Sequence, residues 1–260
     1  MTFAKLFFRK FYMRIRFASL AVFILSFGFT VEAQRYHRFS LQNQELKDGL
    51  NNGLLFNGGA IGYRFGINKN KEKQLTDYHT EIEIGAVFRQ GLLGTNLHFK
   101  PIAYSYGVQI SRTERTKVYA GAKVDWDYRF QLYPDLQMGH SLWMTSLMMS
   151  PVIIVNHQIS DNKSITFLIS NSILGLTSRP KEIEPYYFSL RFTDIVSDLH
   201  SNIQFVSLSQ INDTKVNLDF NFGSTKRCYS LGYAINYLNY SSNPFFNSLT
   251  HCIVFKTSKL

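Results

Sequence analysis

The chain has 260 residues, of which 45% are hydrophobic, 15% aromatic and 18% charged, and its formal net charge is +10. This length permits one large β domain or two small ones, and the absence of a linker rich in Pro, Ser or Gly favours one. The positive charge is moderate; in an exported protein, anionic lipid headgroups are a better explanation for it than nucleic acid, and no nucleic-acid partner is expected.

Residues 1–33 have the organisation of a secretory signal peptide. Five cations, Lys5, Arg9, Lys10, Arg14 and Arg16, precede the uncharged run FASLAVFILSFGFTV at 17–31. This run is shorter than the roughly 20 residues of a membrane-spanning helix, and Val31 and Ala33 are small residues of the kind that signal peptidase reads. We predict cleavage after Ala33, which would lower the net charge to +6; Met13 is an alternative start that opens a more ordinary signal.

Beyond residue 34, apolar and polar residues alternate in segments broken by turn-rich clusters. In TDYHTEIEIGAVFR at 76–89, one face carries aromatic and aliphatic side chains, and the other carries His79, Glu81, Glu83 and Arg89. Similar alternation occupies 54–67, 98–111, 118–130, 215–223 and 229–237, and a last strand is expected at about 247–255. Weaker strand patterns occur at 141–157, 164–176, 186–192 and 199–208.

The length of these segments favours a membrane protein over a soluble one. Strands of soluble sheets have typically about 5 to 6 residues, whereas a tilted strand that crosses a bilayer needs about 9 to 11. The sequence therefore predicts an all-β fold, a single antiparallel transmembrane β-barrel at 34–260. Because single-chain bacterial barrels have an even number of strands, we expect 12 strands, with one around Arg35 to Gln42 closing the barrel, or 10 strands if 186–192 is a loop.

The chain resembles the outer-membrane β-barrel proteins of Gram-negative bacteria, particularly the small aromatic-rich barrels of the Bacteroidota. The resemblance covers nearly the whole mature chain and rests on VEAQ, GGAIGYRFGI, TEIEIGAVFR, VYAGAKVDWDYRF, CYSLGYAINYLNY and HCIVF. Many families share this pattern, so the resemblance does not identify a specific family. It implies location in the cell outer membrane, contact with lipid and lipopolysaccharide, and insertion by the outer-membrane assembly machinery. Such barrels usually finish on an aromatic residue, whereas KTSKL follows Phe255 here.

The face opposite the aromatic one is predicted to line the barrel lumen. Its charged residues are Arg64, His79, Glu81, Glu83, Arg89, Lys123, Asp125, Asp127, Arg129, Lys215 and Asp219. Charges in so confined a space must pair or be solvated. They form either a salt-bridged structural interior or a polar pore or ligand pocket, and the presence of both signs predicts no ion selectivity.

The sequence assigns no metal, cofactor or catalytic residue. His79, Glu81 and Glu83 share a face, but their Cα atoms spread over about 13 Å, too far for three ligands of one ion. Phospholipase and lipid A deacylase barrels place a His and a Ser two positions apart on one strand. Here His157 is three positions from its nearest serine and His200 is adjacent to one, so base and nucleophile face opposite sides.

Cys228 and Cys252 are the two cysteines, and export permits a disulfide between them. A hairpin turn near Tyr240 would place them opposite each other, whereas a turn at SSNP, 241–244, would offset them by about five residues.

The expected function is that of a porin-like narrow passive channel or of a structural or assembly component of the outer membrane. The alternatives are a membrane-embedded hydrolase of lipid or lipopolysaccharide and a soluble periplasmic β-protein; oligomeric state is not predicted.

Overall fold

The computed structural model describes residues 33–71, 73–136, 140–182, 184–185, 199–224 and 227–259. The chain divides at residue 34, and the second of its two units, Gln34–Leu260, contains the described strands. The predicted signal peptide, apart from Ala33, and the weak strand predicted at 186–192 lie outside the described residues. In the described parts, no helix has the length and apolar character needed to cross a membrane.

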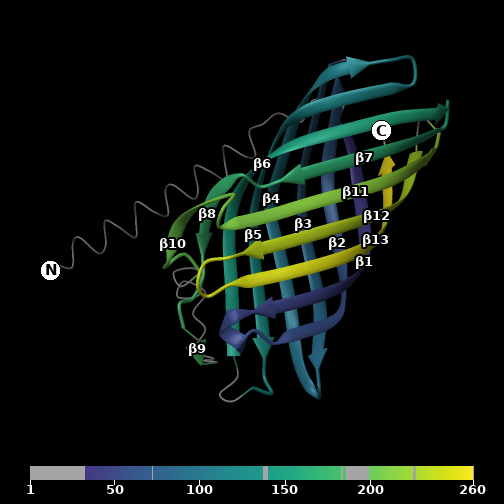
Figure 1. Cartoon of the computed structure of the whole chain (residues 1–260). Helices are drawn as coiled ribbons and strands as arrows, with labels where there is room; N and C mark the ends of the chain where they lie inside the picture. Colours follow the sequence, from purple (N-terminus) through teal and green to yellow (C-terminus); the bar gives the residue numbers. More distant parts are fainter. Residues whose placement is uncertain are drawn as a thin grey trace, which may run out of the picture. The chain divides into compact units, whose positions relative to one another are not determined.

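The second unit consists almost entirely of β-strands (Figure 1). Its strands are β1 Gln34–Asp48, β2 Leu55–Lys71, β3 Gln74–Arg89, β4 Leu92–Arg112, β5 Thr116–Tyr133, β6 His140–Ser160, β7 Lys163–Asn171, β8 Leu174–Ser178, β9 Glu184–Pro185, β10 Ile203–Ser207, β11 Ile211–Gly223, β12 Arg227–Tyr240 and β13 Phe246–Lys259. A single 3₁₀ turn, Gly49–Asn51, follows β1, and the Asp48 side chain accepts a hydrogen bond from the Leu50 amide there.

Ten strands close into a ring in the order β1 to β7, then β11, β12 and β13, and every pairing is antiparallel. The ring closes where β13 pairs with β1, with Arg35 opposite Lys259 and Asp48 opposite Phe246. The strand predicted around Arg35 to Gln42 is therefore present and closes the barrel. Ring closure also leaves none of the ring strands with a free edge, which a membrane barrel requires.

Two further strands lie outside the ring, beside the first half of β6 (Figure 1). β8 pairs with Thr145–Met149 of β6, β10 pairs with β8, and the two-residue β9 pairs with the start of β6. The sequence predicts twelve strands with ten as the alternative; in the described residues the ring has ten, and β8 and β10 are the two outside it. At five residues each, β8 and β10 are too short to cross a bilayer.

Alternation gives the ring an apolar exterior. Leu41, Ile61, Ile84 and Ile253 lie opposite one another on four neighbouring strands and are 57–64% exposed. Phe39, Phe88, Phe99 and Leu231 extend this surface, which is defined as the apolar belt. Soluble proteins rarely expose so large a contiguous apolar surface, whereas lipid-facing strand positions require one. The exterior therefore fits a membrane and argues against a soluble periplasmic protein; the fold is a transmembrane barrel of the outer-membrane type.

The apolar belt predicts a position-dependent cost for a charge on the exterior. Ile84→Arg places the charge at the centre of the belt and is expected to lower the free energy of unfolding by about 2–4 kcal/mol. Ile110→Arg is the matched control, because Ile110 is at least as exposed as Ile84 but lies two residues before the end of β4, where the cost falls to about 0–1 kcal/mol. Reversible urea unfolding in phosphocholine vesicles measures both; equal costs would contradict a lipid-facing belt.

Candidate functional site: the barrel lumen

The two ends of the barrel differ in their connections. At one end, called the termini end, the first and last strands begin and finish side by side, and short turns at 72–73, 113–115, 161–162 and 224–226 join the other strands. At the other end, called the loop end, the connections are 49–54, 90–91, 134–139, 179–202 and 241–245. The turns at the termini end are thus shorter than most connections at the loop end, the asymmetry that outer-membrane barrels show between their periplasmic turns and extracellular loops.

Inward-facing apolar side chains fill the lumen near the loop end. This apolar plug consists of Leu46, Leu50, Phe56, Val87, Tyr133, Leu142, Met144, Met148, Ile211, Leu238, Tyr240 and Phe246, all buried. Val206 of β10, outside the ring, belongs to the same buried cluster. The rings of Phe56 and Tyr133 pack with their centroids 4.6 Å apart. An ion pair covers the plug: Arg179 Nη2 lies 2.8 Å from Asp48 Oδ1, and the guanidinium lies over the rings of Tyr240 and Phe246.

Ion pairs connect neighbouring strands in the middle of the lumen. Glu81 on β3 accepts hydrogen bonds from Arg64 Nε at 3.1 Å and Nη2 at 2.8 Å, and from Lys100 Nζ at 3.2 Å. Arg64 comes from β2 and Lys100 from β4, so one carboxylate links three strands. A bidentate arginine and a second cation satisfy both carboxylate oxygens, which is the condition under which a buried charge is tolerated.

A second group of ion pairs includes one that crosses the lumen between strands that are not neighbours in the ring. Asp125 Oδ2 on β5 accepts from Lys123 Nζ at 2.8 Å and from Lys215 Nζ at 3.1 Å. Lys215 also lies 2.9 Å from Asp213 Oδ2 on its own strand, β11. Because β6 and β7 separate β5 from β11 in the ring, the bond between Asp125 and Lys215 crosses the interior. It fills space that an open pore would leave to water.

His98 on β4 lies between two carboxylates. Its Nδ1 is 2.7 Å from Glu83 Oε2 and its Nε2 contacts Asp127, which also lies 3.4 Å from Arg129 Nη2. The sequence pattern did not assign His98 and Lys100 to the lumen. Both have even residue numbers, and so do the lipid-facing residues in the second half of β4, so regular alternation would place all of them on the exterior. A register shift between Phe99 and Ile102 reverses the alternation, so the residues before it point the other way.

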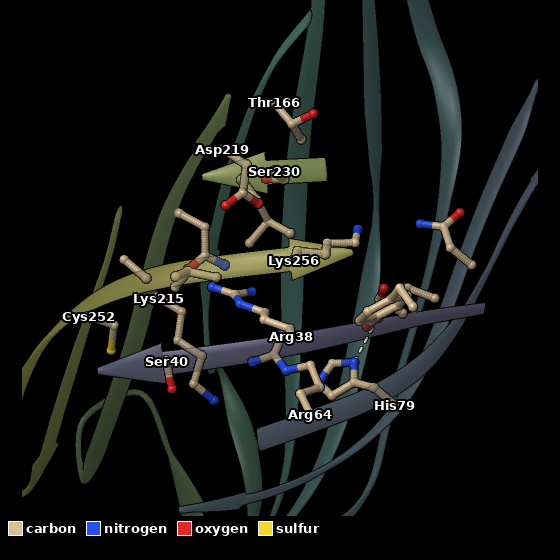
Figure 2. A pocket seen from close by; sticks show the side chains of 18 of the residues that line it. Arg38, Ser40, Arg64, His79, Thr166, Lys215, Asp219, Ser230, Cys252 and Lys256 are labelled. Carbon is tan, nitrogen blue, oxygen red and sulfur yellow. Dashed lines mark hydrogen bonds and ion pairs between the residues drawn. The ribbon is translucent and has the colours of Figure 1, made fainter. Parts of the chain in front are cut away.

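Toward the termini end the lumen contains a cavity of about 430 Å³, called the vestibule. Its lining reaches the exposed turn residues Glu114 and Arg115 at the termini end and stops at Leu238 of the apolar plug. Figure 2 shows that side chains from several strands surround this space, among them Arg38 and Arg64 on β1 and β2. The described residues thus form a polar vestibule with an opening at the termini end and an apolar floor.

The structure brings most of the predicted lumen residues together. The vestibule lining includes Arg64, His79, Glu81, Glu83, Lys123, Arg129, Lys215 and Asp219. Asp125 and Asp127 lie behind these side chains and are bound by lysine and by His98 and Arg129. Arg89 is the exception, because it ends β3 at the loop end and does not line the vestibule. Arg38, Asp77, Asp213 and Lys256 are lumen residues that sequence reasoning did not assign.

The structure excludes the disulfide that the sequence permits between Cys228 and Cys252. Both thiols are free, and Cys252 lies opposite Ala234, six positions along β12 from Cys228. At about 3.3 Å per residue, the offset is on the order of 20 Å, far beyond the span of a disulfide. The reason is the turn: β12 ends at Tyr240 opposite Phe246, so the hairpin turns at 241–245, as the SSNP alternative required.

The histidines considered for hydrolysis have other neighbours. His157 Nδ1 lies 2.9 Å from Thr116 Oγ1 on the adjacent strand, and His200 Nε2 lies 3.1 Å from Tyr128 Oη. Within the described ranges, no group of three His, Cys, Asp or Glu side chains is arranged to hold a metal ion.

No family model matches the chain, and no curated protein matches it. Among solved structures it is similar to the translocator domain of autotransporter NalP from Neisseria meningitidis, at 8% identity and a TM-score of 0.49, over 95% of both chains. It is also similar to the β domain of a Bordetella autotransporter, at 8% identity and TM-score 0.46, over 88% of this chain and 99% of that one. Neisserial surface protein A matches at 10% identity and TM-score 0.36, over 86% and 96%.

Proposed function

We propose that this protein is a non-conducting structural component of the outer membrane, whose lumen forms a vestibule facing the periplasm. The observation that carries the proposal is the apolar plug, because conduction needs a continuous hydrated path. Aromatic and aliphatic side chains packed at the loop end offer an ion no substitute for its water shell. The function proposed involves no cofactor and no catalysis.

The charged side chains in the middle of the lumen also favour a non-conducting structural protein rather than a passive channel. The bond between Asp125 and Lys215 crosses the interior, and the Glu81 and His98 clusters hold their side chains against neighbouring strands. A cation moving through the lumen would have to break contacts that leave one partner buried without its counter-charge. Ion pairs of this kind are costly to break, so they hold these side chains across the lumen.

The difference between the two ends of the barrel suggests how the protein is oriented in the outer membrane. We propose that the N-terminal segment directs export, that the assembly machinery inserts the barrel, and that the apolar belt faces lipid with the termini end in the periplasm. Lipopolysaccharide in the outer leaflet would then contact the exterior nearest the loop end. The short turns at the termini end support this orientation.

Sided labelling tests the proposed orientation. In a background with Cys228→Ser and Cys252→Ser, Thr166→Cys places a thiol in the vestibule, and Gln90→Cys places one on the exposed turn between β3 and β4. A sulfonated maleimide too large for general porins should label Gln90→Cys in intact cells. It should label Thr166→Cys only after the outer membrane is permeabilised. Equal labelling of Thr166→Cys in intact cells would contradict the proposal.

A further inference from the structure

Four inward-facing residues form a row across four strands of the vestibule wall. Arg38 on β1 lies opposite Lys256 on β13, which lies opposite Ser230 on β12, which lies opposite Asn221 on β11. All four line the vestibule, and Figure 2 labels three of them beside Asp219. The row therefore presents a guanidinium, an ammonium and a hydroxyl to one space.

Among the described residues, the two cations of this row form no direct ion pair, unlike Arg64, Lys100 and Lys215. In the described part of the barrel, no carboxylate lies within ion-pair distance of Arg38 or Lys256. Two neighbouring acids are already engaged: Glu81 binds Arg64 and Lys100, and Asp77 lies 2.7 Å from His79 and accepts from the Tyr36 hydroxyl. Arg38 is repelled by both Arg64 and Lys256, whereas the charge of Asp219 attracts Arg38 and Lys256 without forming an ion pair with either. The Lys256 ammonium also lies 4.4 Å from the centroid of the Tyr36 ring.

The hydroxyl beside these cations lacks a partner as well. Ser230 is 1% exposed, and its Oγ has no hydrogen-bond partner among the described residues. Buried polar groups are normally hydrogen-bonded, so a buried hydroxyl that faces the cavity beside Arg38 and Lys256 is free to donate to a ligand there. Asp219 supplies the opposite chemistry, because its buried Oδ1 is a free acceptor on the same wall.

We propose that the vestibule contains a binding site for a small water-soluble anion, with a phosphate or carboxylate group held by Arg38 and Lys256. Ser230 donates a hydrogen bond to the same group. The free oxygen of Asp219 accepts from a hydroxyl or ammonium elsewhere on the ligand, which selects a solute that carries both an anionic group and a donor. Arginine suits this role because its planar fork matches both phosphate and carboxylate.

The ligand comes from the aqueous phase rather than from the bilayer. The row faces the lumen, whereas lipid headgroups surround the exterior of the barrel beyond the apolar belt. The vestibule opens among polar and charged turn residues such as Glu114 and Arg115, which a soluble solute can pass. A cavity of about 430 Å³ accommodates a small metabolite-sized molecule and excludes a protein chain.

Titration calorimetry of the refolded full chain in zwitterionic micelles, with inorganic phosphate and acetate as probes at constant ionic strength, tests the site. Arg38→Gln and Lys256→Gln should each weaken phosphate binding by about tenfold or more. Lys71→Gln is the matched control, since Lys71 is an exposed cation at the end of β2, and it should leave binding unchanged. Wild-type heats no larger than those of the Arg38→Gln, Lys256→Gln double variant would overturn the proposal.

Thermal unfolding of the same proteins separates a ligand site from a structural role. Without ligand, Arg38→Gln should be at least as stable as the wild type, because it relieves repulsion with Arg64 and Lys256. Phosphate should raise the unfolding temperature of the wild type and of Lys71→Gln, but not that of Arg38→Gln or Lys256→Gln. A destabilised Arg38→Gln that phosphate does not affect would make Arg38 a structural counter-ion and contradict the site. Displacement of phosphate by phosphatidylglycerol in the micelles would assign the site to lipid headgroups and overturn the soluble ligand. Neither readout depends on whether the barrel conducts ions.

Discussion

Phe56→Ala is expected to lower the free energy of unfolding by about 3–5 kcal/mol, one of the two largest effects expected of a single substitution in this barrel. Phe56 is 1% exposed and its ring packs against Tyr133 in the apolar plug. Removing the ring leaves a cavity that the barrel wall cannot close, because ring closure fixes the surrounding strands. Guanidinium titration in micelles, followed by tryptophan fluorescence, measures the change.

The matched control for this substitution is Phe39→Ala in the apolar belt. Phe39 is 51% exposed on the exterior, where detergent or lipid fills the space that the ring leaves. Its cost should be clearly smaller than that of Phe56→Ala. Equal costs at the two positions would mean that the loop end of the lumen is not packed as a plug.

Asp125→Asn is expected to cost about 3–5 kcal/mol, because breaking a buried ion pair leaves a charge without compensation. Asp125 is 2% exposed and neutralises both Lys123 and Lys215. Asparagine keeps the shape of the side chain, so the loss reports on charge rather than on packing. Chemical denaturation in micelles at low and at high salt should give the same large loss, since a buried pair is little screened.

Two further variants test whether the loss of stability in Asp125→Asn comes from the broken ion pair. Adding Lys123→Gln should recover part of the lost stability, because Lys215 keeps Asp213 at 2.9 Å and no lysine then lacks a partner. Asp161→Asn on the exposed turn between β6 and β7 should change stability by less than about 0.5 kcal/mol. A double variant as unstable as Asp125→Asn alone would contradict the ion-pair explanation.

Alternation predicted the barrel, its two faces and most of its charged lining, because one face of a membrane strand must be apolar. It failed where the strand departs from regular geometry. The register shift between Phe99 and Ile102 places Lys100 and His98 in the lumen, and no local sequence pattern marks the reversal except Pro101. The offset of Cys252 from Cys228 likewise depended on where a hairpin turns, a detail that the alternating pattern leaves open.

The apolar plug was the largest feature missed. Its members come from distant segments, so only the closed ring brings Leu46, Leu142 and Phe246 together. One signal was present: residues 141–157 are apolar on both faces, which a strand lining a wholly polar lumen does not need. Leu142, Met144 and Met148 are the inward-facing residues of that segment and belong to the plug. A strand that is apolar on both faces indicates lipid on one side and a packed interior on the other.

Planar-bilayer recording of the refolded wild-type protein tests the central claim, that the lumen is closed at the loop end, most directly. A general porin refolded and added in the same way serves as the control for insertion, and heat-modifiable migration in gels confirms that the barrel has folded. The account predicts that the porin gives conductance steps and that this protein gives none above the baseline. Reproducible, stable conductance steps from the folded wild-type barrel would contradict it.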